Sequence, residues 1–99
     1  LLSMEEAIKK ITSDTADIWA IPDRGLLKSG YIADITIFDA NTIDRGPEYY
    51  VQDVPGDGHR YVRDAIGVET VIIGGAVAYD HLLGYSDEHR GQVIGAPQR

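Results

Sequence analysis

The sequence predicts an α+β fold in which two short N-terminal helices precede a few β-strands that include a Gly-Gly hairpin. Three observations lead to this prediction. A capped amphipathic segment opens the chain, an alternating apolar segment occupies residues 30–39, and a second apolar segment at 68–73 runs directly into Gly74-Gly75. The 99 residues suit one small domain whose hydrophobic core is thin.

The first helix is expected over about residues 4–12. Ser3 and Glu6 have the residue types and spacing of a capping box, in which each side chain bonds to the backbone N–H of the other residue. Apolar residues then recur on one face of such a helix, at Met4, Ala7, Ile8 and Ile11. Because so short a helix is unstable by itself, this face must pack on another element.

A second short helix is expected to follow, ending near residue 20. Residues 12–14 are predicted to interrupt the first helix, and Ser13 or Asp14 to cap the second. The residues predicted to turn inward, with the single tryptophan assigned to the core, are Ala16, Trp19 and Ala20.

The segment 30–39 is the strand around which the rest of the chain is organised. Its apolar and more polar positions alternate, with Ala33, Ile35 and Ile37 on one face and Asp34, Thr36 and Phe38 on the other. That period of two predicts a strand with one buried face. The second face is only half polar, so it is expected to be partly covered as well.

The rest of the chain is predicted to be a long loop followed by a hairpin. Residues 41–67 are expected to be irregular and, because they contain tyrosines and valine, to pack on a neighbour. Residues 68–73 and 76–79 are predicted to form two strands joined by a tight Gly-Gly turn of the primed type. Residues 92–94 are a candidate brief strand.

These elements carry more apolar surface than they can cover among themselves. Three or four strands and two short helices are a poor set for an independent sheet. We therefore infer that missing strands complete the sheet, from another part of a parent chain or from a second subunit. The chain also opens on Leu1 and not on Met, so we expect a processed product or a fragment.

Composition argues against several classes of partner. The net charge of −7, from 16 acidic and 9 basic residues, opposes binding to nucleic acid and to anionic membranes. The absence of Cys excludes disulfides, thiolate chemistry and zinc–thiolate sites. No apolar run reaches the roughly 20 residues of a membrane span. We expect a cytoplasmic location.

The three histidines, His59, His81 and His89, lack the spacing of a metal-binding pair. His59 follows Asp57 in a glycine-rich loop, where it could make a mobile metal or catalytic contact, although an exposed loop histidine is the favoured interpretation. His81 and His89 each follow carboxylates and could form a weak cation site. The spacing of the two histidines does not favour such a site.

The loop also holds three carboxylates and two arginines, Asp53, Asp57, Asp64, Arg60 and Arg63. Buried paired carboxylates could do acid–base chemistry. In a loop broken by Gly and Pro, solvated or salt-bridged side chains are the favoured interpretation.

Two aspartates lie within the segment 30–39, one near the start of the strand and one at its exit, and the glycine motifs do not match known phosphate sites. Asp34 and Asp39 occupy ordinary turn-facing positions beside the strand. The paired glycines fit neither a phosphate loop nor a nucleophile elbow.

In their order, these signals resemble the C-terminal end of the amidohydrolase superfamily, and in particular its branch of N-acyl-D-amino-acid deacylases (D-aminoacylases). The motifs that carry the resemblance are Glu5-Glu6-Ala7-Ile8-Lys9-Lys10-Ile11-Thr12, Arg24-Gly25-Leu26-Leu27, Gly30-Tyr31-Ile32-Ala33-Asp34-Ile35-Thr36-Ile37-Phe38-Asp39, Asn41-Thr42-Ile43-Asp44-Arg45 and Gly67-Val68-Glu69-Thr70-Val71-Ile72-Ile73-Gly74-Gly75. The likeness extends to about Tyr79. The turn at Gly74-Gly75, often Asn-Gly in this family, is a departure from its pattern.

The resemblance implies a structural role for the chain. Such enzymes place a His-x-His pair, further His ligands and an Asp on a TIM-like barrel, upstream of the helix that begins here. None of those positions maps onto this sequence, so we assign no catalytic, cofactor-binding or metal-binding residue to it. Zinc or another divalent metal is expected in the parent enzyme.

The resemblance also implies a division of the chain. Residues 1–24 would be helices from the end of the barrel, and residues 25–99 the C-terminal strands of a composite β-sandwich. The expected partner is the rest of the parent barrel enzyme or a second copy of the chain. The parent would hydrolyse non-peptide C–N amide bonds of N-acyl-D-amino acids. The alternative is a stand-alone β module that acts through dimerisation.

Overall fold

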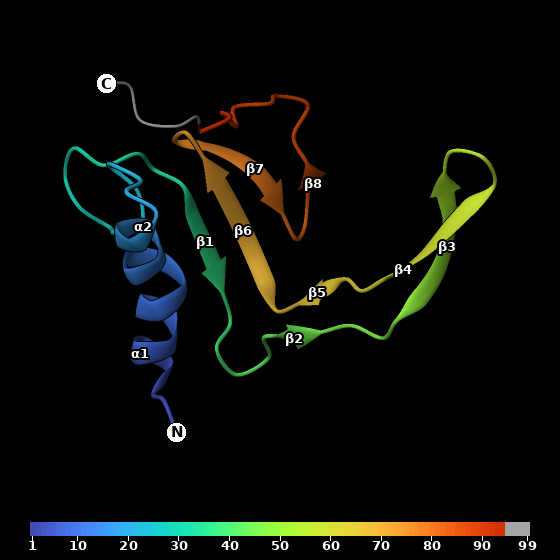
Figure 1. Cartoon of the computed structure of the whole chain (residues 1–99), viewed down its shortest axis with the longest axis horizontal. Helices are drawn as coiled ribbons and strands as arrows, with labels where there is room; N and C mark the ends of the chain where they lie inside the picture. Colours follow the sequence, from blue (N-terminus) through green and yellow to red (C-terminus); the bar gives the residue numbers. More distant parts are fainter. Residues whose placement is uncertain (95–99) are drawn as a thin grey trace.

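The computed structural model describes residues 1–94 of the chain. They form a helical segment, a four-stranded antiparallel sheet and a projecting hairpin arm (Figure 1), which is the predicted α+β class. In chain order the elements are α1 (Met4–Lys9), the π-helical turn η1 (Lys10–Asp14), α2 (Thr15–Ile18), β1 (Ile35–Phe38), β2 (Asp44–Arg45), β3 (Tyr49–Val54), β4 (Gly58–Val62), β5 (Ala65–Ile66), β6 (Val68–Ile73), β7 (Ala76–Asp80) and β8 (Gly84–Tyr85).

The helix begins at the predicted capping box. The Ser3 hydroxyl oxygen accepts a hydrogen bond from the Glu6 backbone N–H at 3.2 Å, and the Glu6 carboxylate accepts one from the Ser3 N–H at 3.5 Å. Two of the N–H groups left open at the start of a helix are thereby satisfied. The prediction for this end of the helix is confirmed.

The prediction of two separate helices is wrong, because the helical backbone continues from α1 through η1 into α2. Asp14 does not cap a new helix; its carboxylate pairs with the Lys9 ammonium at 2.9 Å instead. The hydroxyls of Thr12 and Thr15 donate back to carbonyls of the preceding turn at 2.6 Å each. Polar residues that suggested a break therefore bond to the helix itself, and the chain absorbs them as one wide π turn.

The sheet has the strand order β1-β6-β7-β8, with every neighbouring pair antiparallel. The predicted hairpin is confirmed: Ile73 faces Ala76 across a two-residue turn. Gly74 and Gly75 have φ angles of 58° and 81°. Two positive φ angles define the type I′ turn, whose twist matches that of the strands, and glycine adopts them without steric cost.

β1 is shorter than the predicted strand at 30–39 and lies at one edge of the sheet. A bulge between Ile37 and Phe38 breaks the expected alternation of buried and exposed residues. Ile37 is consequently 43% exposed, whereas Phe38 is partly buried. The candidate strand at 92–94 is not formed, and β8 occupies the opposite edge of the sheet.

Residues 44–66 form the arm, which corrects the prediction of an irregular loop. β3 pairs with β4 and β2 pairs with β5, both antiparallel. The turn between β3 and β4 places Gly56 and Asp57 at positive φ, 76° and 60°. At its base, a Cβ on Gly67 would lie 2.7 Å from the Ile43 backbone, and the Gly46 N–H donates to the Asp64 carbonyl at 2.6 Å. Close backbone packing therefore fixes the arm where it leaves the sheet.

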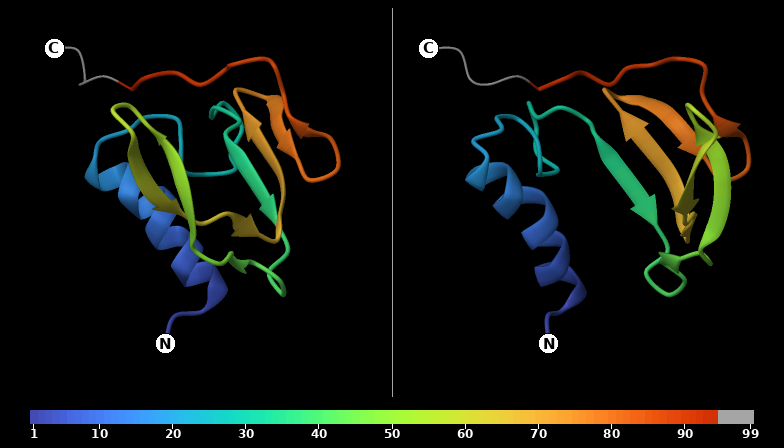
Figure 2. Two further views of the ribbon diagram at one scale, coloured as in Figure 1. Left: turned by 90° about the vertical axis from the view of Figure 1, so that its right-hand side faces the viewer. Right: turned by 45° about the vertical axis from the view of Figure 1, so that its right-hand side comes forward.

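The helix and the arm lie toward the same side of the sheet, at opposite ends of the molecule (Figures 1 and 2). Between them little is buried: Ala16, 7% exposed, is the one buried hydrophobic residue among those described. Trp19 is 73% exposed, so its assignment to the core is wrong for this chain by itself. No other element of the described residues covers the helix face that carries it.

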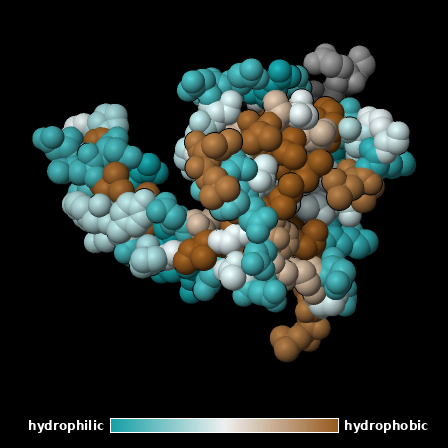
Figure 3. Space-filling model, turned by 180° about the vertical axis from the view of Figure 1, so that it is seen from behind, coloured by the Kyte–Doolittle hydropathy of each residue, from teal (hydrophilic) through white to brown (hydrophobic). Residues whose placement is uncertain are grey.

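The surface is too large for a self-contained globule of this mass. The accessible area is 8362 Å², whereas a compact protein of 10.8 kDa exposes about 5,500 Å². The radius of gyration is 16.2 Å, against about 13 Å for a compact domain of this length. Seen from behind, hydrophobic residues gather over the sheet (Figure 3). The elements were predicted to carry more apolar surface than they can cover, and in the fold much of this surface is exposed.

Candidate functional site

The carboxylate of Asp34, directly before β1, connects parts of the chain that are far apart in the sequence. One oxygen accepts a hydrogen bond from the Gly74 N–H at 2.9 Å, and the other accepts from the Arg24 guanidinium at 3.1 Å. The Gly75 N–H donates to the Ala33 carbonyl at 3.0 Å beside it. The Gly74 N–H above all, with help from Arg24, lowers the pKa of Asp34 below its ordinary value. Asp34 thus joins the post-helix loop, the start of β1 and the Gly-Gly turn.

An open groove of about 640 Å³ lies beside this junction. Its walls come from β1, β6 and the segment 90–94, and they are mainly apolar. The charged residues in it are already engaged, since Arg24 pairs with Asp34 and Arg90 pairs with Glu88 at 3.0 Å. The groove holds no histidine and no activated nucleophile among its lining residues, so it offers a surface for packing and no evident chemistry.

Of the three loop carboxylates that the sequence singled out, two are paired in the arm and the third is exposed, which agrees with the favoured interpretation of salt-bridged or solvated side chains. Arg60 makes two hydrogen bonds to Asp53, at 2.8 and 2.7 Å, and these lower the pKa of that carboxyl. Asp64 accepts from the Tyr49 hydroxyl at 3.1 Å, which raises the pKa of the phenol. Asp57 lies in the hairpin turn and is exposed. Exposed, ion-paired carboxylates of this kind are poor general acids or bases.

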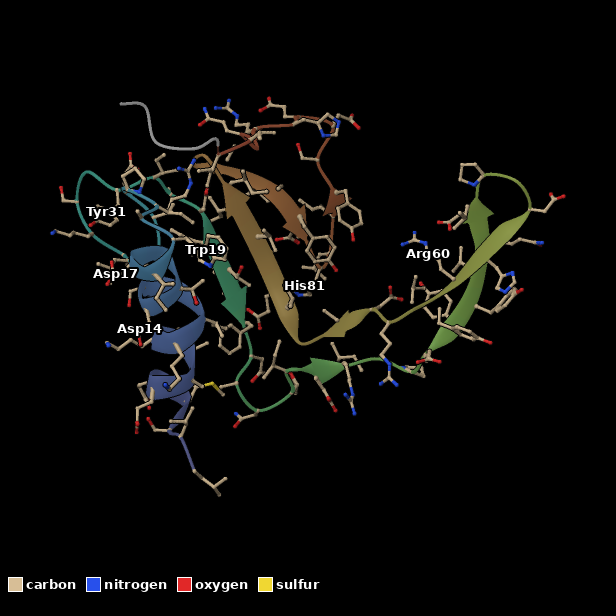
Figure 4. The ribbon with its side chains drawn as sticks, in the orientation of Figure 1. Asp14, Asp17, Trp19, Tyr31, Arg60 and His81 are labelled. Atoms are coloured by element: carbon tan, nitrogen blue, oxygen red, sulfur yellow. The ribbon has the colours of Figure 1, made fainter. Side chains whose placement is uncertain are left out.

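The three histidines lie in different parts of the fold and have different contacts. His59 stacks on Tyr50 in the arm, with ring centroids 4.6 Å apart. His81 follows β7, where Nδ1 lies 3.1 Å from the Glu69 carbonyl oxygen. His89 is exposed in the segment after β8. Figure 4 shows His81 on the main sheet and Arg60 on the arm, at separate ends of the strand system.

Residues 1–94 contain no group of three His, Asp or Glu side chains able to hold a metal ion. The candidate cation site at His81 and His89 is therefore not formed in this part of the chain. Asp80 bonds to the Leu82 N–H at 2.9 Å, which lowers its pKa and closes a turn. The side chains described here do not fit the divalent metal expected in a parent enzyme.

No helix within the described part of the chain combines the length and the apolar character that crossing a membrane requires.

Sequence reasoning missed the role of Asp34, which it treated as an ordinary turn residue. Its partner Gly74 lies 40 residues further along the chain, so no local spacing indicates the bond. Only the fold brings the two together. Asp39 behaves as expected, because its carboxylate accepts from the Asn41 N–H at 2.9 Å in a local turn.

Comparison with known proteins gives similarity to a series of hydrolases. N-acyl-D-glutamate deacylase of Alcaligenes xylosoxydans xylosoxydans is 30% identical over 104 residues, covering 99% of this chain and 19% of the relative. D-aminoacylase of the same organism is 31% identical over 94 residues, covering 95% of this chain and 17% of the relative. A dihydroorotase of Endomicrobium trichonymphae is 51% identical over 39 residues, or 39% of this chain and 9% of the relative.

This chain spans less than a fifth of the length of the two deacylases. No solved structure matches it significantly. The family model described as "Amidohydrolase family" matches residues 1–79, which is most of the chain and includes the helix, the arm and the Gly-Gly hairpin. On this evidence the chain belongs to the amidohydrolase family.

Proposed function

We propose that this chain is the non-catalytic C-terminal segment of a metal-dependent amidohydrolase that hydrolyses the amide C–N bond of N-acyl-D-amino acids. The observation that carries the proposal is the alignment of nearly the whole chain with less than one fifth of each of two such deacylases. The family assignment gives the reaction class, and the relatives' names give the substrate class. Both come to this chain as proposals.

The large open surface supports a role as one piece of a bigger fold. Exposed apolar side chains occur on the helix, at Ile11, Ile18 and Trp19, and on the loop after it, at Leu26 and Leu27. Burying such side chains contributes about 1.5–3 kcal/mol each, which an isolated chain forgoes. A barrel that continued from the helix, together with further strands on the sheet, would recover this stabilisation.

The metal and the catalytic groups are proposed to lie upstream. Within residues 1–94 the carboxylates are paired or exposed, and none converges with histidine on a possible ion. Zinc or another divalent metal would polarise the amide carbonyl in the parent. The role that we propose for this chain is to complete and hold the fold around those groups.

The proposed domain boundary falls between residues 24 and 25. Residues 1–24 would belong to the barrel and residues 25–99 to the sandwich, of which 95–99 lie outside the described residues. The Arg24–Asp34 ion pair at 3.1 Å and a hydrogen bond from the Ile32 N–H to the Asp23 carbonyl at 2.8 Å cross the boundary. Gly25 also lies against the helix, since a Cβ added to it would be 3.1 Å from the Ala16 Cβ. Close packing of this kind supports two parts that move together.

The first test is to read the coding frame upstream of Leu1 and to express the whole product. We expect a barrel-length frame with a His-x-His pair near its start. We expect the protein to hydrolyse N-acetyl-D-glutamate or another N-acyl-D-amino acid, to lose this activity with a chelator, and to regain it with Zn²⁺. The matched control is the L-enantiomer of the same substrate, which should be a poor substrate.

A start codon close to Leu1, or a full-length product with no metal-dependent amidase activity, would contradict the proposal. A stable dimer of a 99-residue product would then favour the association module. We propose a cytoplasmic location, to be checked by fractionating cells that express the full-length protein.

A further inference from the structure

The two faces of the arm differ in character. Tyr50 and Tyr61 are directly opposed across β3 and β4, so their side chains share one face. Tyr49 and Val62 form the next opposed pair and lie on the other face, because successive residues of a strand alternate. The two faces of the arm therefore carry different side chains.

The first face carries an aromatic cluster, which we define as Tyr50, His59 and Tyr61. The Tyr50 ring stacks on His59 at 4.6 Å and meets Tyr61 edge-on at 5.5 Å. Both tyrosines stay open to solvent, at 52% and 64% exposed. Three rings ordered against each other and left half-exposed are typical of the centre of a contact surface.

The polar side chains of the second face are hydrogen-bonded to one another. Arg60 makes both hydrogen bonds to Asp53, and the Tyr49 hydroxyl is taken by Asp64. Groups paired in this way gain little from a further partner and must be desolvated to meet one. The aromatic face is thus the side of the arm better suited to bind another surface.

The arm is also held in place. The Gly67 Cα approaches the Ile43 backbone so closely that any side chain would overlap it, and the Gly46 N–H bonds to the Asp64 carbonyl. The arm projects from the sheet on the side where the helix lies (Figures 1 and 2). β3 and β4 pack chiefly on each other, so an arm fixed at its base presents its aromatic face in a defined direction.

The area of the aromatic face helps to decide whether it binds a second copy of the chain or another part of the same polypeptide. β4 has five residues. At about 3.3 Å per residue and 4.8 Å between strands, one face of the hairpin measures on the order of 200 Å². A stable dimer buries roughly 800 Å² on each partner. The face by itself is too small to hold two copies together, whereas a contact within one polypeptide avoids the free-energy cost of bringing two molecules together.

We propose that the aromatic cluster of the arm packs on the part of the parent polypeptide that precedes Leu1, so that the arm clasps the upstream domain from the side of the helix. The inference rests on the proposed function, since it requires a longer parent. It adds a specific interaction surface within that parent.

The test is site-specific photocross-linking in the full-length parent. Benzoylphenylalanine replaces Tyr61 on the aromatic face or, as the matched control, Tyr49 on the other face. Tyr49 is also exposed, at 45%, and belongs to the same hairpin. Each variant is irradiated as an equal mixture of ¹⁴N- and ¹⁵N-labelled protein, and the cross-linked peptides are identified by mass spectrometry.

We expect the probe at position 61 to cross-link to peptides upstream of Leu1 that carry the same label, with a yield at least about tenfold above that from position 49. Mixed-label cross-links would show a second copy as the occupant and overturn the proposal. Equal yields from both positions, or no cross-link from position 61, would overturn it too.

Metal-dependent amidase activity of the same samples separates this proposal from the proposed function. If the parent is active but position 61 gives no cross-links, the proposed hydrolase function stands and the proposed packing of the arm is overturned. An inactive wild-type parent contradicts the hydrolase, whatever the cross-links show.

Discussion

The sheet and the arm are both antiparallel β structure, yet different interactions hold them. The sheet joins β1 to β6 although residues 39–67 separate the two strands, and the Asp34 carboxylate accepts a further bond from Gly74. The arm pairs strands that are separated by one short turn, and its polar side chains pair with each other. The β1–β6 pairing of the sheet joins residues far apart in the sequence, whereas the β3–β4 pairing of the arm joins residues close in the sequence. Mutations should therefore act differently in the two regions.

The largest effect is expected where the two regions meet. Gly67→Ala forces a side chain into a position 2.7 Å from the Ile43 backbone, at a φ of +85°. Strain and overlap together should cost about 3 kcal/mol of the parent's unfolding free energy. Urea unfolding of the full-length protein measures this loss.

Gly56→Ala is the matched control for this change. Its φ is +76°, but nothing lies within 4 Å of the added methyl, so only the backbone strain of about 1 kcal/mol should remain. If the two variants lose equal stability, close packing does not fix the base of the arm.

A smaller loss is expected inside the sheet. Asp34→Ala leaves the Gly74 N–H and the Arg24 guanidinium without their acceptor. Because the site is partly exposed, the cost should be about 1 kcal/mol. Amide hydrogen exchange at Gly74 in the parent should accelerate, while exchange in β3 and β4 stays unchanged. Equal acceleration in the arm would mean that the two regions unfold as one unit.

The same carboxylate predicts an acid dependence. The pKa of Asp34 is lowered in the folded chain, so its contribution is present above the ordinary value of 3.8 and is lost as pH falls through the lower folded pKa. The difference in urea midpoint between the wild type and Asp34→Asn should shrink over that interval. A difference that is independent of pH would contradict the assigned ion pair.

The arm should respond at the alkaline end. The hydrogen bond to Asp64 raises the pKa of Tyr49 above 10.0, so the contact persists below that value and is lost as pH rises through the folded pKa. Tyrosinate absorbance should show a late-titrating component that disappears in Tyr49→Phe. Tyr31→Phe, in the loop before β1, is the control that should leave this component in place, because Tyr31 is not among the groups that shift the pKa of Tyr49.

The smallest effect is expected for the exposed ion pair of the arm. Asp53→Asn removes the charge that faces Arg60, but both side chains lie in solvent. Amide exchange in β3 and β4 should change by less than about twofold. A larger change would mean that this pair orders the arm, and the arm would then resemble the sheet more than its contacts suggest.

Local signals were sufficient for the elements that close on themselves. The capping box at Ser3 and Glu6 and the turn at Gly74 were predictable, because residue type and short spacing determine both. The arm was missed although its β-forming residues flank a turn-forming Pro-Gly pair at residues 55–56. The scattered glycines predict a loop there, whereas the fold follows the strand propensity on either side of the turn.

Non-local features were beyond the sequence. The bond between Asp34 and Gly74 spans 40 residues, and the bulge after Ile37 reverses the expected alternation. Residue type predicts Trp19 in the core, but the side chain is exposed because no other described element packs over it. The absence of catalytic residues from the chain stays a prediction, since it rests on the resemblance.

Among the described residues β1 is an edge strand, which has a consequence for the protein in a cell. A strand whose outer backbone groups are unpaired can add strands from other molecules and so seed aggregates. In the longer parent that we propose, proteolysis near Leu1 would release a fragment in which this edge and an apolar face are both open. Chaperones and proteases would act on such a fragment. Cleavage at that point would therefore lower the amount of intact protein in the cell.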